Sequence, residues 1–166
     1  MILTAHQPNF CPWLPYFQKI EQADVFVILG QPQYEKGGFQ NRFNVGDNWY
    51  TMSVNKGLTP IHTKQYVNVQ HDWKKITRSF PQLRVFDQQV MSSLYTMNSC
   101  IIMQACKILG IKTDITFDLP TRVTGTERLV ELCKEHNATT YLSGISGKKY
   151  LDIKLFHDAG VNVILP

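Results

Sequence analysis

The sequence opens with a strand, a helix and a second strand, and this second strand is apolar at every position. Residues 25–29 read Val-Phe-Val-Ile-Leu, which is typical of a strand that is covered on both faces. Residues 2–6 form a short strand before it. Between the two strands, Phe17 and Ile20 stand three apart, as on one face of a helix over residues 14–22. This order predicts a βαβ unit with a right-handed crossover.

The middle of the chain departs from this alternation. Residues 39–54 are expected to form a β-hairpin with its turn at Gly46, since Gly-Asp-Asn is a sequence that hairpin turns favour. Asp72 is expected to cap a short helix over residues 73–80. A longer helical stretch is expected over residues 90–109. These elements predict an antiparallel insertion and a central helical segment.

The strand–helix alternation then returns. Strands are expected over residues 111–117, 139–142 and 161–165, with helices after Thr124 and over residues 152–159. The pattern predicts an α/β fold: a doubly wound, mostly parallel sheet with a small antiparallel hairpin insertion and a central helical segment.

Composition limits the class of protein. A chain that is 43% hydrophobic and 18% charged is typical of a soluble globular protein. No linker or repeat interrupts it, so residues 1–166 are expected to form a single domain. The start lacks the basic segment and cleavage site of a secretory signal, and the four cysteines form no Cys-x-x-Cys pair, which predicts a cytoplasmic protein.

A net charge of +4 is too small and too dispersed for a dedicated nucleic-acid-binding domain, although it does not exclude nucleic acid. It is compatible with a small phosphate-bearing ligand. The histidines and cysteines show no ligand-like spacing, so no metal site is expected. No motif assigns a cofactor, and ATP with Mg²⁺ is left open.

Ligands of open α/β sheets bind at the carboxyl ends of the strands, and the first loop at such an end follows residues 2–6. His6 can give or take a proton there, and Gln7 and Asn9 offer donors and acceptors. An alternative is that His6 is a partly buried strand-end residue satisfied by the backbone. Trp13 or Tyr16 could line a sugar or base pocket, although both are core residues by default.

The second loop of this kind covers residues 33–42. Gln33, Tyr34 and Asn41 supply polar side chains, and Arg42 can grip a carboxylate or phosphate with two parallel hydrogen bonds. The alternative is a solvated approach to the hairpin with an ordinary surface salt bridge.

The third loop begins at Ser143, after the strand over residues 139–142. Two glycines, two hydroxyls and two lysines at a strand-to-helix junction can form a nest of backbone N–H groups for an anion such as phosphate. The alternative is an exposed turn. The spacing excludes a Walker A loop. The predicted phosphate-binding residues are Ser143, Gly144, Ser146, Gly147 and Lys148.

The chain resembles a known family at both ends. His6-Gln7-Pro8 and the run Pro12-Trp13-Leu14-Pro15-Tyr16-Phe17-Gln18-Lys19-Ile20 are similar to the opening of WbqC-like proteins. Ala138-Thr139-Thr140-Tyr141-Leu142-Ser143-Gly144 is similar to their C-terminal half.

The resemblance implies a place in O-antigen or other surface-polysaccharide gene sets and an aminoacyl transfer to an amino sugar. Gly30 and Gln31 stand where acidic residues are usual in the family. Carried over position by position, the family's polar signature falls on His6, Gln7, Gln33, Tyr34, Asn41, Arg42, Arg128, Ser143, Gly144 and Gly147.

The leading hypothesis is therefore a transferase that adds a glycine-like amino-acid or acyl group to a nucleotide-linked amino sugar. His6 would be the general acid/base, with Arg42 and Arg128 holding carboxylate or phosphate. The alternatives are a non-catalytic nucleotide- or sugar-binding subunit and an accessory protein in nucleic-acid modification. A homodimer or a larger modification complex is left open.

Overall fold

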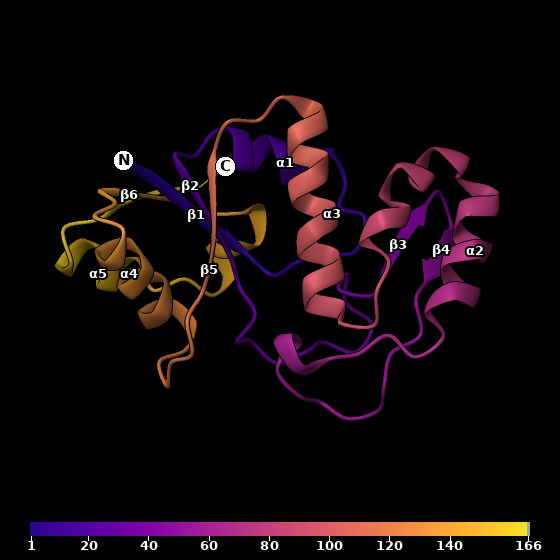
Figure 1. Ribbon diagram of the computed structural model, residues 1–166. Helices are drawn as coiled ribbons and strands as arrows, with labels where there is room; N and C mark the ends of the chain where they lie inside the picture. Colours follow the sequence, from indigo (N-terminus) through magenta and orange to yellow (C-terminus); the bar gives the residue numbers. More distant parts are fainter. Residues whose placement is uncertain (166) are drawn as a thin grey trace. The chain divides into compact units, whose positions relative to one another are not determined.

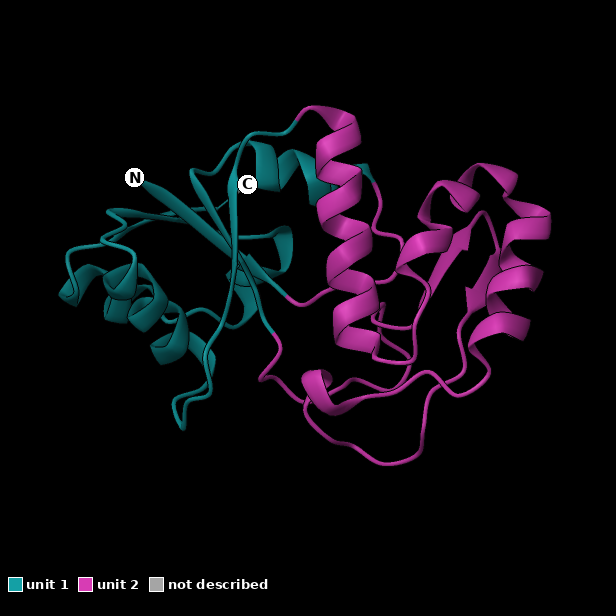
Figure 2. Ribbon diagram, viewed as in Figure 1, with its two compact units in different colours: residues 1–6, 14–29, 111–166 teal, residues 7–13, 30–110 magenta. Residues whose placement is uncertain are grey.

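The computed structural model describes residues 1–165, which cluster into two compact units (Figure 2). Unit 1 comprises residues 1–6, 14–29 and the described chain from 111 onward, and unit 2 comprises residues 7–13 and 30–110. The expectation of a single domain over residues 1–166 stays a prediction. No helix among residues 1–165 is long and apolar enough to cross a membrane.

Unit 1 contains a sheet of five strands that are all parallel to their neighbours. The order across the sheet is β5-β2-β1-β6-β7, so the first strand lies in the middle. The chain therefore builds one half of the sheet, returns to the centre and builds the other half, as in a doubly wound fold. The bounds are β1 Ile2–His6, β2 Val25–Ile28, β5 Asp114–Phe117, β6 Thr140–Leu142 and β7 Asn162–Ile164.

Helices cover both faces of this sheet (Figure 1). Helix α1 (Leu14–Glu21) covers one face, where Tyr16 packs edge-on against Phe26 with ring centroids 5.8 Å apart. Successive residues of a strand point to opposite faces, so Val27 points to the other side. There it joins a core with α4 (Gly125–Glu135) and α5 (Ile153–Asp158). The α/β, doubly wound expectation is confirmed.

Unit 2 contains the antiparallel insertion and the central helices. Strands β3 (Arg42–Val45) and β4 (Asn48–Thr51) form the hairpin, and Gly46 takes the left-handed conformation, with φ +58°, that its turn requires. The remaining elements are α2 Val69–Ser79, α3 Leu94–Leu109 and three-residue-per-turn helices at Ile61–Thr63 and Pro81–Gln89. Their apolar side chains share one core that includes Met52, Trp73, Leu94 and Ile101.

Two expectations for the helices of unit 2 were wrong in detail. Helix α2 begins at Val69, so Asp72 lies inside its first turn and does not cap it. The Asp72 carboxylate instead accepts a hydrogen bond from the Ser53 N–H at 2.7 Å. Helix α3 begins only at Leu94, because the Ser93 hydroxyl caps it.

Candidate functional site

The order of strands reverses between β1 and β6, and this is the position where doubly wound sheets bind their ligands. Leu3 of β1 pairs with Tyr141 of β6, so the two strands run side by side to their carboxyl ends. His6 is the last residue of β1, and Ser143 follows β6 directly. The strand ends that carry His6 and Ser143 therefore lie at the switch point of the unit 1 sheet.

Lys19 of α1 reaches the same position. Its Nζ donates a hydrogen bond of 3.1 Å to the Ala5 carbonyl, at the end of β1. A Cβ placed on Gly144, beyond the end of β6, would lie 4.0 Å from that Nζ. Sequence reasoning missed this residue as part of the site. The available signal was its spacing, because Lys19 stands three residues after Tyr16 on the helix face that packs onto the sheet.

The Lys19 ammonium group has unused capacity for a ligand. Burial lowers its pKa from the ordinary value of 10.5 to about 8, so roughly 90% of it is charged at neutral pH. An ammonium group has three donors. Within residues 1–165 the Ala5 carbonyl is its hydrogen-bond acceptor, and no carboxylate forms an ion pair with it. A partly buried cation of this kind favours an anionic ligand.

His6 is held in place by α1. Its imidazole packs edge-on against the Tyr16 ring, with ring centroids 4.9 Å apart, and its carbonyl accepts a hydrogen bond from the Leu29 N–H at 2.9 Å. The side chain is half-buried. His6 directly follows Ala5, the residue whose carbonyl accepts the hydrogen bond from Lys19.

The turn after β6 is held together by hydrogen bonds to the Gly144 carbonyl. Ser143 is buried, and its hydroxyl donates to the Gly144 carbonyl at 3.0 Å. The Gly147 N–H also donates to that carbonyl, at 2.9 Å. A Cβ on Gly147 would lie 1.8 Å from the Ser143 Oγ, so the glycine is required for space. Ser146 and Lys148 are exposed, and their phosphate-binding role stays a prediction.

Arg128 lies on the first turn of α4 and is already paired. Its Nη1 contacts Glu135 at 2.7 Å and Glu131 at 3.2 Å. Burial opposes its charge, but hydrogen bonding to Glu135, together with charge attraction to Glu135 and to Asp118, raises the pKa of the guanidinium. These carboxylates already compensate the positive charge of Arg128 that would otherwise attract a substrate phosphate. Substrate binding by Arg128 stays a prediction.

In unit 2, most of the predicted substrate-binding residues bond to each other or to the backbone. The Tyr34 hydroxyl donates to the Asn41 side chain at 2.9 Å, and the Asn41 amide donates to the Met52 carbonyl at 2.7 Å. Gln7 accepts a hydrogen bond from the Gln40 amide. The second loop is thus tied to the hairpin by its own polar side chains.

Arg42 also forms hydrogen bonds within this loop. Its Nε donates to the Gly38 carbonyl at 3.2 Å and its Nη2 donates to the Gly37 carbonyl. The guanidinium lies over the Trp49 ring, 4.0 Å from the centroid. Gln33 is exposed and makes an isolated bridge to Pro60. Roles for these two residues in ligand binding stay predictions, as does that of Asn9, which is buried.

No group of three His, Cys, Asp or Glu side chains within residues 1–165 is arranged to hold a metal ion. The four cysteines are unpaired, and burial raises the pKa of the Cys106 thiol to about 11 and that of Cys133 to about 12. Such thiols are neutral at physiological pH and do not act as nucleophiles.

Comparison with known proteins identifies the family of this chain. It is 27% identical to the uncharacterized protein Rv1507c of Mycobacterium tuberculosis (strain ATCC 25618 / H37Rv), over 180 positions that cover 95% of this chain and 78% of that relative. No solved structure matches it significantly. The model of the WbqC-like protein family matches residues 7–165. The chain therefore belongs to the WbqC-like protein family.

Proposed function

We propose that the protein is a transferase that adds an amino-acid or acyl group to the amine of a nucleotide-linked amino sugar, at the switch point of the unit 1 sheet. One observation carries the proposal. A partly buried Lys19 ammonium without a carboxylate partner in residues 1–165 lies between the ends of β1 and β6, beside His6. This arrangement supplies a site for phosphate and a proton acceptor next to it.

The roles follow from the chemistry of these groups. Lys19 attracts the substrate phosphate by its charge and its unused donors. The amine nitrogen of the sugar attacks the carbonyl of an acyl group that is activated as an ester or a phosphoric anhydride. A carbon–nitrogen bond forms, and the bond from the carbonyl carbon to the leaving oxygen breaks. His6 takes the proton from the attacking amine and returns it to the leaving oxygen.

Membership of the WbqC-like family supports this class of reaction, because the family resemblance implies aminoacyl transfer to an amino sugar. The proposed partner is therefore a small-molecule nucleotide sugar. A donor amino acid would need activation, and ATP with Mg²⁺ is the proposed source.

The test is a transfer assay followed by mass spectrometry. The purified protein is incubated with uridine- and thymidine-diphosphate amino sugars and glycine or an acyl donor, with and without ATP and Mg²⁺. The proposal expects a product heavier than the nucleotide sugar by the acyl group minus the proton that it replaces. Binding of a nucleotide sugar without any such product would favour the non-catalytic binding subunit.

A further inference from the structure

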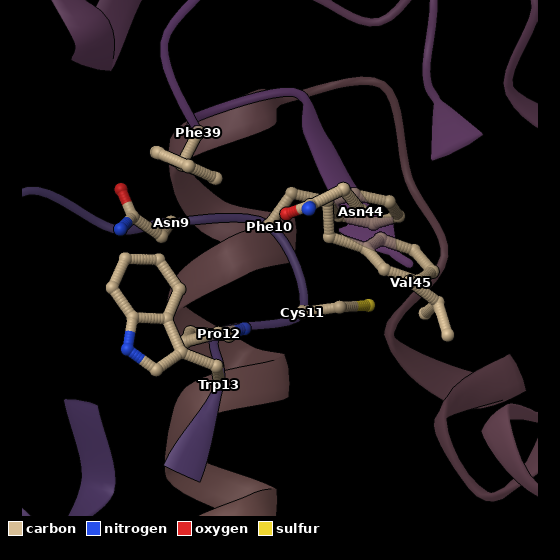
Figure 3. Close-up of a pocket in the computed structure, with 9 residues that line it drawn as sticks. Asn9, Phe10, Cys11, Pro12, Trp13, Phe39, Asn44 and Val45 are labelled. Carbon is tan, nitrogen blue, oxygen red and sulfur yellow. The ribbon is translucent and has the colours of Figure 1, made fainter. Parts of the chain in front are cut away.

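A pocket of about 380 Å³ lies within unit 2 (Figure 3). None of the residues that line it takes part in the transfer reaction proposed for the edge of the unit 1 sheet. It is formed by residues 9–13, by Phe39 and by residues 43–45 of β3. Asn9, Trp13 and Phe39 lie on one side of the pocket, and Asn44 and Val45 lie on the other (Figure 3). Its volume is within the range of about 300–1,000 Å³ that small-molecule sites occupy.

The walls combine an exposed aromatic face with amide groups. Trp13 is 49% exposed and meets the Phe39 ring at 63°, with centroids 5.0 Å apart. Asn9 is only 4% exposed, and within residues 1–165 no hydrogen bond joins its side-chain amide to another group; the small part that stays exposed includes the amide atoms. An amide that lines a pocket and makes no hydrogen bond to the protein is available to a ligand. The exposed Asn44 amide lies across the pocket.

The backbone of this wall adopts an uncommon conformation. Cys11 has φ +46°, in the left-handed region that residues other than glycine rarely adopt. It stands between Asn9 and Trp13, which both line the pocket. Backbone conformations of this kind are concentrated at ligand sites, where the surrounding structure maintains them.

The chemistry of the lining selects the ligand. None of the lining side chains, which all belong to the described chain, carries a charge, and burial raises the pKa of the Cys11 thiol to about 12. The ligand group is therefore uncharged. Amides both donate and accept hydrogen bonds, which suits hydroxyl groups. The Trp13–Phe39 pair forms a corner and not a parallel slot, which suits a ring that stacks on one face only.

We propose that this pocket binds an uncharged saccharide ring, whose C–H face packs on the Trp13 indole and whose hydroxyls bond to the Asn9 and Asn44 amides. The inference goes beyond the proposed function, since it assigns a saccharide site to unit 2 whatever reaction takes place at the sheet edge of unit 1. Its test reads binding alone, so a failure of the transfer assay does not decide it.

The test is saturation-transfer NMR and titration with the methyl glycosides of glucose, galactose, N-acetylglucosamine and N-acetylgalactosamine, at concentrations up to about 50 mM to capture millimolar affinity. Uridine and adenosine are the comparison probes. At least one glycoside is expected to bind, with transfer to the protons of one ring face. Binding of nucleosides alone, or of no glycoside at all, would overturn the proposal.

Variants locate the binding. Trp13→Ala is expected to weaken glycoside binding about tenfold or more. The matched control is Trp49→Ala, because Trp49 is 46% exposed and also contacts Phe39 but does not line the pocket. It should bind as the wild type does. Equal losses in both variants would overturn the proposal.

A second variant tests the pocket independently, in case Trp13→Ala changes the fold. Asn44→Ala removes an exposed amide, and it should weaken glycoside binding about three- to tenfold, as expected for one lost hydrogen bond. Thermal unfolding checks that each variant retains the wild-type fold. Unchanged affinity in a folded Asn44→Ala protein, together with unchanged affinity in Trp13→Ala, would rule out the pocket as the site.

Discussion

Two lysines, one in each unit and both shielded from solvent to some degree, show how differently the units use their polar groups. Both have a pKa that burial lowers. Lys64 of unit 2 is fully buried, donates to the Asn55 carbonyl at 2.6 Å and the Gly57 carbonyl at 2.9 Å, and lies 4.8 Å from the centre of the Tyr34 ring. Lys19 of unit 1 has a single carbonyl partner at the end of a strand.

This difference in hydrogen-bond partners indicates which polar residues are available to bind a ligand. Lys64 joins a loop to the core and has its donors directed at the protein itself, as do Tyr34 and Asn41. Lys19 keeps donors that the described chain does not use, at the position where the sheet topology places a ligand. Polar composition marked both the second loop and the ends of β1 and β6 as candidate sites. The hydrogen bonds of each side chain distinguish these two candidate sites.

The largest expected effect concerns the proton acceptor of the sheet edge. His6→Ala should lower the transfer rate about 100-fold or more, because the imidazole carries the proton from the attacking amine to the leaving oxygen. The affinity for the nucleotide sugar should change little, since this role concerns the reaction step and not substrate binding. Steady-state kinetics measures both quantities. The control is His157→Ala, which changes a histidine in unit 1 whose side chain is 89% exposed. Full activity in His6→Ala would remove this residue from the mechanism.

Lys64 should behave as a structural residue. Lys64→Met leaves the Asn55 and Gly57 carbonyls without their buried donor, so the free energy of unfolding should fall by about 1–3 kcal/mol. Urea denaturation measures the fall. Anion affinity should stay at the wild-type value. If Lys64→Met weakened anion binding and left stability intact, the contrast between the two lysines would be lost.

A smaller effect is expected at Tyr34. Tyr34→Phe removes the hydroxyl that donates to Asn41, and the protein should lose about 1 kcal/mol of unfolding free energy. Chemical denaturation measures the loss, and the transfer rate of the folded variant should match that of the wild type. A tenfold slower folded variant would instead show that Tyr34 contacts the substrate, as the family resemblance implies.

The last prediction concerns the pH dependence of stability that Lys19 introduces. Its pKa is about 8 in the folded chain against an ordinary 10.5, so the unfolded chain binds the proton more tightly. Stability contributed by Lys19 should therefore rise as the pH rises from about 8 to about 10.5. Urea denaturation across this range measures the slope, and Lys19→Met should reduce it. An unchanged slope in that variant would show that Lys19 is not buried as described.

Local sequence signals predicted most of unit 1. The apolar run at residues 25–29 and the spacing of Phe17 and Ile20 identified the βαβ unit, because they report burial within one element. The strand-end rule then placed His6 and Ser143 at one edge of the sheet, which the pairing of β1 with β6 confirms. These features depend on residues close together in the sequence.

Features that depend on distant contacts escaped the sequence reasoning. Asp72 looked like a helix cap because nothing local shows that its carboxylate bonds to Ser53. Lys19 looked like one more residue of a helix, since its contact with Ala5 arises only when α1 packs on the sheet. Phosphate binding by Gly147 stays a prediction, and no local signal shows that this glycine also makes room for the Ser143 hydroxyl.

The most direct test of the central assignment is the affinity of the protein for pyrophosphate and for uridine diphosphate, measured by isothermal titration calorimetry near neutral pH. Lys19→Met should weaken binding about tenfold or more, since a charge-assisted contact contributes roughly 1.5–3 kcal/mol. Lys154→Met, which changes an exposed lysine of α5 in the same unit, should bind as the wild type does. Equal affinity in the wild type and Lys19→Met would contradict the assignment of the unit 1 sheet edge as the phosphate site.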